Sequence, residues 1–186
     1  MTTQIRPLLT IADLEALPES DEQYELINGD LLVSRAPHIA HQFAISNLLY
    51  ALKEYLSRNP IGRVVPEPGV VLSENDSVRP DIAYLTNERF MEILSGGKLY
   101  GAPDLVVEIL SAGAENERRD RNIKRRLYGK YGVREYWIVD WRASHVEVHR
   151  LSESGLELIE TLSGEDKLTS PLLPDFSYKV AGIFDV

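Results

Sequence analysis

The stretch Asp104-Leu-Val-Val-Glu-Ile-Leu110 decides the predicted fold. Its apolar residues do not alternate with polar ones, so we expect a strand that is buried on both faces within a central sheet. Glu108 lies in its middle and shares a strand face with Val106 and Leu110. An unpaired charge in such a place costs free energy and is usually retained for a reason. The stretch therefore predicts both the sheet and a carboxylate that needs a partner.

The segments on either side of this strand predict a mixed sheet flanked by helices. A helix from about Ala114 to Tyr131, ended by Gly132, leads into the apolar strand Glu135–Val139. Strand, helix and strand of this length indicate a right-handed crossover between parallel strands. Upstream, apolar spacing and proline positions predict a helix at 38–58, strands at 62–72 and 78–85, an interruption at Pro66-Glu67-Pro68 and a short helix at 88–94.

A hairpin is predicted ahead of this core. Asn28-Gly29 is the dipeptide typical of a type I′ turn, in which both central residues have positive φ. A two-residue loop pairs Leu26 with Leu31 and places Glu25 on the opposite face, beside Ile27. Taken alone, Glu25 is interpreted as a half-exposed strand residue.

The length of 186 residues favours a single domain over residues 1–186, because two comfortable domains would need more chain. We expect an N-terminal helix and hairpin at about 10–34, then an α/β core of αβββαβ order at about 38–140. Beyond the core, the pattern predicts an appended C-terminal hairpin at about 144–186.

Composition excludes several classes of protein. No apolar run approaches the ~18 residues of a membrane span, and residues 1–22 lack the blocks of a signal peptide, so we expect a cytoplasmic protein without a membrane partner. The absence of cysteine excludes thiol catalysis and leaves only oxygen or imidazole ligands for a metal. The net charge of −9 argues against binding nucleic acid through a uniformly basic surface, although a segregated basic patch is compatible with it.

A helical wheel of residues 114–131 places two charges on the inward side, Asp120 and Lys124. The inward arc is formed by Ile123, Leu127, Tyr128 and Tyr131, and the opposite side carries Arg118, Arg121, Asn122, Arg125 and Arg126. Taken alone, Asp120 and Lys124 are explained equally well as an i,i+4 salt bridge at the helix rim. The arginines alone are better explained as a solvated face than as contacts to DNA.

Two further polar residues stand at the start of apolar patterns. Asp81 follows Pro80 and precedes the apolar strand 82–85, so it also needs a partner, although a strand end is better hydrated. His41 opens the apolar stripe of the helix at 38–58, where a core histidine is commoner than a functional one. His145 and His149 lack carboxylates at ligand spacing and are interpreted as structural.

Two carboxylates on adjacent strands, with a lysine from the following helix, are what metal-assisted phosphodiester hydrolysis requires. Their oxygens suit Mg²⁺ or Mn²⁺, which orients and acidifies water, while the lysine polarises the water or the phosphate. This spacing alone is weak, because Asp and Glu are common residues.

The combined motifs resemble a large bacterial family of restriction-endonuclease-like proteins within the PD-(D/E)XK nuclease superfamily. The resemblance covers roughly residues 9–184 and implies a restriction-endonuclease-like fold, a central mixed sheet in αβββαβ order, a Mg²⁺-dependent site and nuclease activity. The segments that carry it are Tyr24-Glu-Leu-Ile-Asn-Gly-Asp30, Arg79-Pro-Asp-Ile-Ala83, Gly101-Ala-Pro-Asp-Leu-Val-Val-Glu-Ile-Leu-Ser111, Asp120 to Lys124 with Tyr128, and Tyr131-Gly-Val-Arg-Glu-Tyr-Trp-Ile-Val-Asp140.

The resemblance implies roles for individual residues. Asp81 corresponds to the aspartate of the PD motif and Glu108 to the second acid, both as metal ligands. The superfamily's lysine lies two residues beyond the second acid, where this sequence has Leu110. In this family the lysine is expected on the following helix, which makes it Lys124.

The remaining implied site residues support this centre. Glu25 would be an additional catalytic acid, His41 a nearby polar residue, and Asp120 the residue that positions Lys124. These three would form one site with Asp81, Glu108 and Lys124. The implied substrate is nucleic acid, most readily DNA, whose phosphates the basic side of the helix could contact through Arg118, Arg121 and Arg125.

Two functions follow from these observations. The first is a Mg²⁺-dependent endonuclease, and because enzymes that cut both strands are often two-fold dimers, a homodimer is the expected assembly. The second is a nuclease-fold module that binds nucleic acid or protein without cutting, which the charge of −9 and Leu110 both permit. The retained acids favour cleavage.

Overall fold

The computed structural model describes residues 7–18, 22–34 and 37–186, so the interpretation of residues 1–22 lies partly outside the described residues. The helices are α1 (Ile11–Glu15), α2 (Ile39–Arg58), α3 (Asn87–Ile93), α4 (Ala114–Arg118) and α5 (Arg125–Lys130), with a π-helical segment η1 (Arg119–Lys124) and a 3-10 segment η2 (Val180–Ile183). The strands are β1 (Gln23–Ile27), β2 (Asp30–Ser34), β3 (Gly62–Pro66), β4 (Val70–Ser73), β5 (Asp76–Val78), β6 (Ile82–Thr86), β7 (Leu94–Ser95), β8 (Lys98–Tyr100), β9 (Leu105–Ile109), β10 (Glu135–Asp140), β11 (His145–Ser152), β12 (Gly155–Ser163), β13 (Lys167–Ser170) and β14 (Leu173–Lys179).

The central sheet has the strand order β12-β11-β10-β9-β6-β3. Strands β9 and β10 are parallel and are joined through α4, η1 and α5, which is the predicted crossover, while the other neighbours are antiparallel. The series α2, β3, β6, β9, the helical crossover and β10 reproduces the predicted αβββαβ order. The predicted mixed sheet with flanking helices is therefore confirmed.

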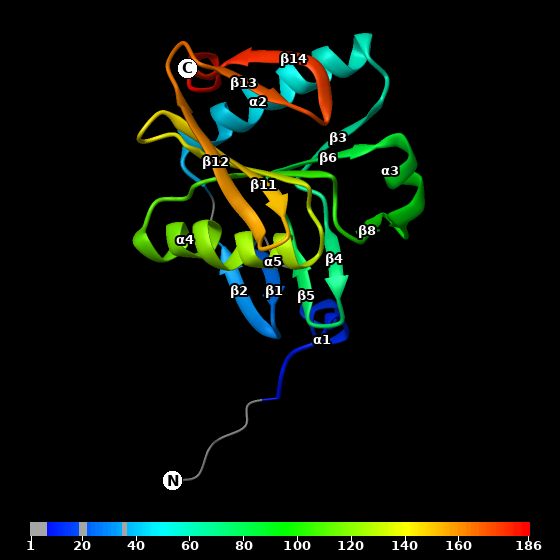
Figure 1. Cartoon of the computed structure of the whole chain (residues 1–186). Coiled ribbons are helices and arrows are strands. Elements are labelled where there is room, and N and C mark those ends of the chain that lie inside the picture. The colour runs from blue at the N-terminus through cyan, green and yellow to red at the C-terminus, as the bar shows by residue number, and fades with distance from the viewer. Residues whose placement is uncertain (1–6, 19–21, 35–36) are drawn as a thin grey trace.

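Each face of the central sheet carries its own apolar core. On one face, α2 and the small sheet β13–β14 pack against side chains such as Val107 and Trp137, which are fully buried. On the other face, Val106 and Leu110 pack with Leu127 and Tyr128 of α5. Figure 1 shows α2 with β13 and β14 on one side and α4 and α5 on the other. Glu108 belongs to the second face, because strand residues alternate in direction.

A second sheet, of order β2-β1-β5-β4-β8-β7, contains the predicted hairpin. Asn28 and Gly29 have φ of 52° and 77°, and Leu26 pairs with Leu31, so the turn and its register are confirmed. Glu25 is only 4% exposed, however, which corrects its interpretation as a half-exposed residue. Pairing of β1 with β5 places the hairpin inside a larger sheet and withdraws this acid from water.

The two predicted strands at 62–72 and 78–85 are each divided between the sheets. Strands β3 and β6 belong to the central sheet, whereas β4 and β5 belong to the second sheet. The chain crosses between the sheets at Glu67 and again before Asp81, and the Glu67 backbone N–H donates to the Asp81 carbonyl, with N and O 2.9 Å apart. Proline at positions 66, 68 and 80 cannot donate to a sheet ladder, which favours the breaks. Asp81 consequently lies where the two sheets meet.

The predicted helix 114–131 is not a regular α-helix, because residues 119–124 are π-helical. A π-helical turn contains more residues than an α-helical turn, so a wheel drawn at about 100° per residue loses register there. Ile123, placed inward by the wheel, is 38% exposed, whereas Asp120 and Lys124 are each 2% exposed. The wheel was therefore wrong for Ile123, and its inward placement of the two charges is confirmed.

The predicted C-terminal hairpin at 144–186 is more than an appendage. Strand β11 pairs with β10 along its length and β12 pairs with β11, so both extend the central sheet. Val146 and Val148 are fully buried in its core. The apolar side chains of β11 must be buried in a core, which explains why this hairpin joins the central sheet and is not an appendage. Among the described residues, no helix has the length and apolar character needed to cross a membrane.

Candidate functional site

Asp81 and Glu108 lie side by side at the junction of the two sheets. Ile82 pairs with Val107 in antiparallel strands, and continuing that register by one residue places Asp81 opposite Glu108. Directly opposed residues point to the same sheet face, with Cβ atoms about 4.5–5.5 Å apart. The Ile109 backbone N–H donates to Asp81 Oδ2, at 2.6 Å between N and O, and fixes the aspartate against β9.

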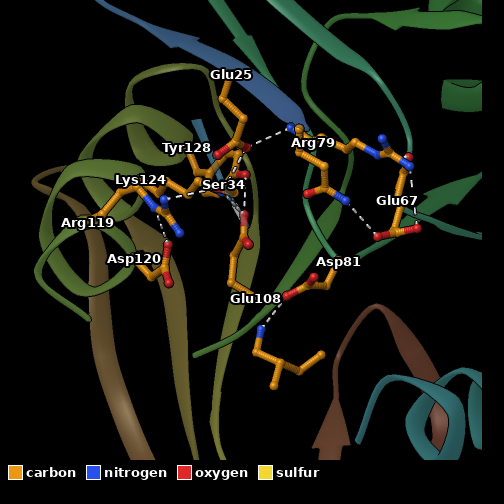
Figure 2. Close-up of polar contacts among 12 residues, drawn as sticks. Glu25, Ser34, Glu67, Arg79, Asp81, Glu108, Arg119, Asp120, Lys124 and Tyr128 are labelled. Carbon is orange, nitrogen blue, oxygen red and sulfur yellow. Dashed lines mark hydrogen bonds and ion pairs between the residues drawn. The ribbon is translucent and has the colours of Figure 1, made fainter. Parts of the chain in front are cut away.

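The Glu108 carboxylate is buried with two donors on the same oxygen. It is 4% exposed, and its Oε1 lies 3.0 Å from Lys124 Nζ and 2.7 Å from the Tyr128 hydroxyl (Figure 2). Burial raises the pKa of Glu108; the Lys124 ammonium opposes this shift, and the nearby acids reinforce it. The dominant cause is the loss of water around the charged form.

Lys124 bridges two acids from different parts of the chain. Its Nζ lies 2.8 Å from Glu25 Oε1 as well as 3.0 Å from Glu108 Oε1. Burial alone would lower the pKa of Lys124, but Glu108, Glu25 and Asp120 outweigh it and raise this pKa, so the side chain is an ammonium. The simple salt bridge at the helix rim is therefore wrong, because Lys124 faces inward to acids on β1 and β9.

Asp120 has a different partner from the one expected. Its Oδ1 accepts from Arg119 Nε at 3.2 Å, and Arg119 Nη1 donates to Ser34 Oγ at 3.3 Å. Burial raises the pKa of Asp120, while Lys124 and Arg119 oppose that shift. Asp120 thus acts on Lys124 through its charge and holds Arg119 directly. Sequence reasoning missed Arg119, because a wheel gives a residue's face but not its hydrogen-bond partner.

Glu25 and His41 complete the set of predicted site residues. Glu25 Oε1 accepts from the Arg79 backbone N–H, at 2.8 Å between N and O, in addition to its contact with Lys124. His41 Nε2 lies 3.4 Å from Asp81 Oδ2, and its buried Nδ1 has no hydrogen-bond partner among the described residues. The six predicted residues line one cavity, in which Lys124 contacts Glu25 and Glu108, His41 contacts Asp81, and Asp120 contacts Arg119.

Glu67, Arg79 and Tyr128 are neighbours of this group that the sequence analysis did not assign to it. Arg79 Nη2 lies 3.4 Å from Glu67 Oε2, and Gln23 Nε2 donates to Glu67 Oε1 at 3.1 Å. Figure 2 shows Glu67 and Arg79 beside Asp81 and Tyr128 beside Glu108. A positive φ of 45° at Glu67, between two prolines, is a signal that only the structure reveals.

Two of the three arginines predicted to contact phosphate are engaged within the protein. Arg121 pairs with Asp140 at 3.0 Å and with Glu147, and Arg125 Nη1 donates to the Leu156 carbonyl at 3.1 Å. These partners belong to β10, β11 and β12, whereas Asn122 and Arg126 on the same side of the helix are exposed. Arg118 is exposed.

A cavity of about 40 Å³ lies among the acids and is lined by Glu25, His41, Asp81, Glu108, Asp120 and Lys124 together with neighbouring residues. Its volume exceeds the ~10–15 Å³ that a cavity needs to hold one water molecule, so a small ion fits in it. Within residues 7–18, 22–34 and 37–186, no group of three His, Asp or Glu side chains is arranged to hold a metal.

The donor set nevertheless fits a hard divalent cation. The contacts of Asp81 use Oδ2 and those of Glu108 use Oε1, which leaves the second oxygen of each without a hydrogen bond in the described part of the chain. Mg²⁺ is commonly bound by only one or two carboxylates together with water and substrate phosphates. Two free carboxylate oxygens beside a cavity of this size meet that requirement.

Comparison with known proteins shows a family and a similar solved structure. The family model described as "Uma2: Putative restriction endonuclease" matches residues 11–181. A crystal structure described as a putative nuclease belonging to DUF820, from Anabaena variabilis ATCC 29413, is similar with a TM-score of 0.76 and 20% sequence identity, over 95% of this chain and 97% of that chain. At this identity the likeness shows a shared fold. No curated protein matches the chain.

Proposed function

The chain belongs to the Uma2 family, and from this premise we propose that it is a nuclease that hydrolyses phosphodiester bonds, with DNA as its substrate and Mg²⁺ or Mn²⁺ as its cofactor. The observation that carries the proposal is the placement of the Lys124 ammonium 3.0 Å from Glu108, on the strand against which the Ile109 backbone N–H holds Asp81. Leu110, at the usual lysine position, is fully buried in the core. The lysine from the helix thus takes the place of the one missing from the strand.

Asp81 and Glu108 are the residues that would hold the cation, each through its free oxygen. When bound there, a divalent cation would acidify water and neutralise charge that builds on the scissile phosphate. His41 and the Ile109 backbone N–H orient Asp81, since both contact its other oxygen. These contacts fix the two acids before substrate arrives, which is the preorganisation that catalysis requires.

Lys124 contributes a fixed positive charge. Since its pKa is raised, it does not accept a proton near neutral pH and cannot serve as the general base. Its ammonium instead stabilises negative charge next to Glu108 in a site that excludes water, where such interactions are strongest. Glu25 holds the ammonium in place from the opposite side, with 2.8 Å between Nζ and Oε1.

Arg118 is the arginine that we propose to contact the DNA backbone, because it is exposed while Arg121 and Arg125 have internal partners. A single exposed contact is consistent with the net charge of −9, which disfavours broad electrostatic binding. Cleavage of both strands calls for two active sites, so we also propose a two-fold homodimer acting in the cytoplasm.

The proposal is tested by incubating the protein with duplex DNA, single-stranded DNA and RNA in Mg²⁺, Mn²⁺ or EDTA. We expect cleavage of DNA with either cation and none with EDTA. Asp81→Asn, which removes one charge at nearly constant shape, should abolish cleavage. Glu88→Gln, which makes the same kind of change at an exposed position on α3, should cut like the wild type. Binding of DNA without cleavage under all conditions would instead support the non-cutting module.

A further inference from the structure

We propose that Tyr128 is a positioning residue of this centre: its hydroxyl and the Lys124 ammonium together hold one oxygen of Glu108, so that the other oxygen faces the cation. This inference rests on the proposed metal site at Asp81 and Glu108. Tyr128 itself is fully buried. Unlike Glu108 and Lys124, it is not among the residues that line the cavity, so it acts through the carboxylate rather than by contact with substrate or cation.

The hydrogen bond from Tyr128 is short and shares its acceptor with Lys124. The hydroxyl lies 2.7 Å from Glu108 Oε1, and Lys124 Nζ lies 3.0 Å from the same atom. Two donors on one oxygen fix both the rotation of the carboxylate and the choice of its free oxygen. Hydrogen bonds to a charged acceptor are also about twice as strong as neutral ones, so this clamp is hard to displace.

A buried tyrosine hydroxyl does not always have a partner in this fold. Tyr84, an equally buried tyrosine on β6, has a hydroxyl without a hydrogen-bond partner in the described residues. A buried phenol is thus tolerated here without a partner. The Tyr128 ring packs against the Tyr136 ring, with 5.2 Å between centroids, and that apolar contact would remain in phenylalanine. The hydroxyl of Tyr128 is therefore directed at Glu108 rather than at the core.

The π-helical segment places both donors on Glu108. Lys124 ends this segment and Tyr128 follows one α-helical turn later, while Ile123 is turned outward. The Tyr136 hydroxyl donates to the Asp120 carbonyl at 3.1 Å and ties the segment to β10. Short π-helical segments occur frequently at functional sites. This one directs a lysine and a tyrosine, four residues apart, to one carboxylate oxygen.

Asp81 is held in the same way from the other side of the cavity. Its Oδ2 accepts from the Ile109 backbone N–H and lies 3.4 Å from His41 Nε2. Each acid is thus fixed through one oxygen by two neighbours. Loss of such an outer contact to a metal ligand typically lowers metal affinity by about 10–100-fold.

The test is a titration with Mn²⁺ alone, followed by electron paramagnetic resonance of the free ion, without nucleic acid. We expect the wild type to bind Mn²⁺ and Tyr128→Phe to bind it at least about tenfold more weakly. Tyr84→Phe, the matched control, should bind within twofold of the wild type, because it removes a hydroxyl that has no partner. Thermal midpoints are recorded first, and each protein is titrated well below its own midpoint so that folding does not limit binding.

If Tyr128→Phe binds Mn²⁺ as tightly as the wild type and Asp81→Asn binds none, the role of Tyr128 is overturned and the metal site is supported. A wild type that binds no Mn²⁺ would overturn the metal site and, with it, this inference. Because the titration does not depend on cleavage, a lack of nuclease activity would leave its result intact. The two proposals can therefore fail separately.

Discussion

Replacement of Lys124 by methionine should destabilise the folded protein strongly at alkaline pH and less at acidic pH. Methionine keeps most of the apolar stem, so the main loss is the ammonium, which lies 2.8 Å from Glu25 and 3.0 Å from Glu108. Removal of one partner of a buried ion pair costs about 3–5 kcal/mol, whereas an exposed pair contributes at most about 1 kcal/mol. Since Lys124 is 2% exposed, we expect the larger loss.

The pH dependence follows from Glu108, which loses the Lys124 ammonium. Burial already raises the pKa of Glu108, and loss of Lys124 removes the main opposing charge. In the variant the folded state therefore binds more protons than the unfolded chain, so its stability falls as pH rises. The difference between wild type and variant should be largest near pH 8 and should shrink toward pH 5, where the Glu108 carboxyl can be protonated.

Urea denaturation at pH 8 and pH 5, followed by tryptophan fluorescence, measures this effect through the buried Trp137. Lys53→Met on α2 is the matched control, because Lys53 is exposed, and it should change the free energy of unfolding by less than about 0.5 kcal/mol. A loss below about 1 kcal/mol for Lys124→Met at pH 8, or a loss equal at both pH values, would refute the reasoning.

Three other expected results follow from particular residues. Burial lowers the pKa of His149 to about 4, so the free energy of unfolding of the wild type should fall by up to about 3 kcal/mol between pH 6.5 and pH 4. In urea titrations, His149→Gln should lose less stability over this pH range. An unchanged pH dependence in the variant would exclude His149 as the source of the loss. Arg118→Gln should weaken DNA binding, measured by fluorescence anisotropy, without changing the thermal midpoint. The slope of the logarithm of the binding constant against the logarithm of the salt concentration should become smaller by about 1, and an unaltered slope would exclude Arg118 from the interface. Gly29→Ala should lower stability by more than about 1 kcal/mol, because φ is +77° and the new Cβ would lie 2.6 Å from Leu8 Cβ; a thermal midpoint equal to that of the wild type would contradict this.

The features that the sequence could predict depend on local chemistry. Asn28-Gly29 set the turn and hence the pairing of Leu26 with Leu31, because few residues adopt two positive φ angles. The all-apolar strand around Glu108 predicted a buried parallel neighbour, and β10 is that neighbour. These features follow from spacing within a few residues.

The features that the sequence could not predict depend on contacts between distant segments. The division of residues 78–85 between two sheets is decided by pairing with β1 and β9, which a local pattern does not contain. The exposure of Ile123 follows from a π-helical segment that a regular wheel cannot represent. The burial argument predicted that Glu108 needs a partner, but it could not name Tyr128 as a donor, because tyrosine on an inward arc is ordinarily a core residue.

The activity proposed for Glu108 and Asp81 is cation-dependent cleavage of DNA. Its most direct test is cleavage of supercoiled plasmid by the wild type and by Glu108→Gln, with Mg²⁺, after chelation with EDTA, and after Mg²⁺ is restored. We expect the wild type to cut only when Mg²⁺ is present and to recover when it is restored, while folded Glu108→Gln cuts under none of these conditions. Cleavage by the wild type in EDTA, or cleavage by folded Glu108→Gln at the wild-type rate, would contradict it.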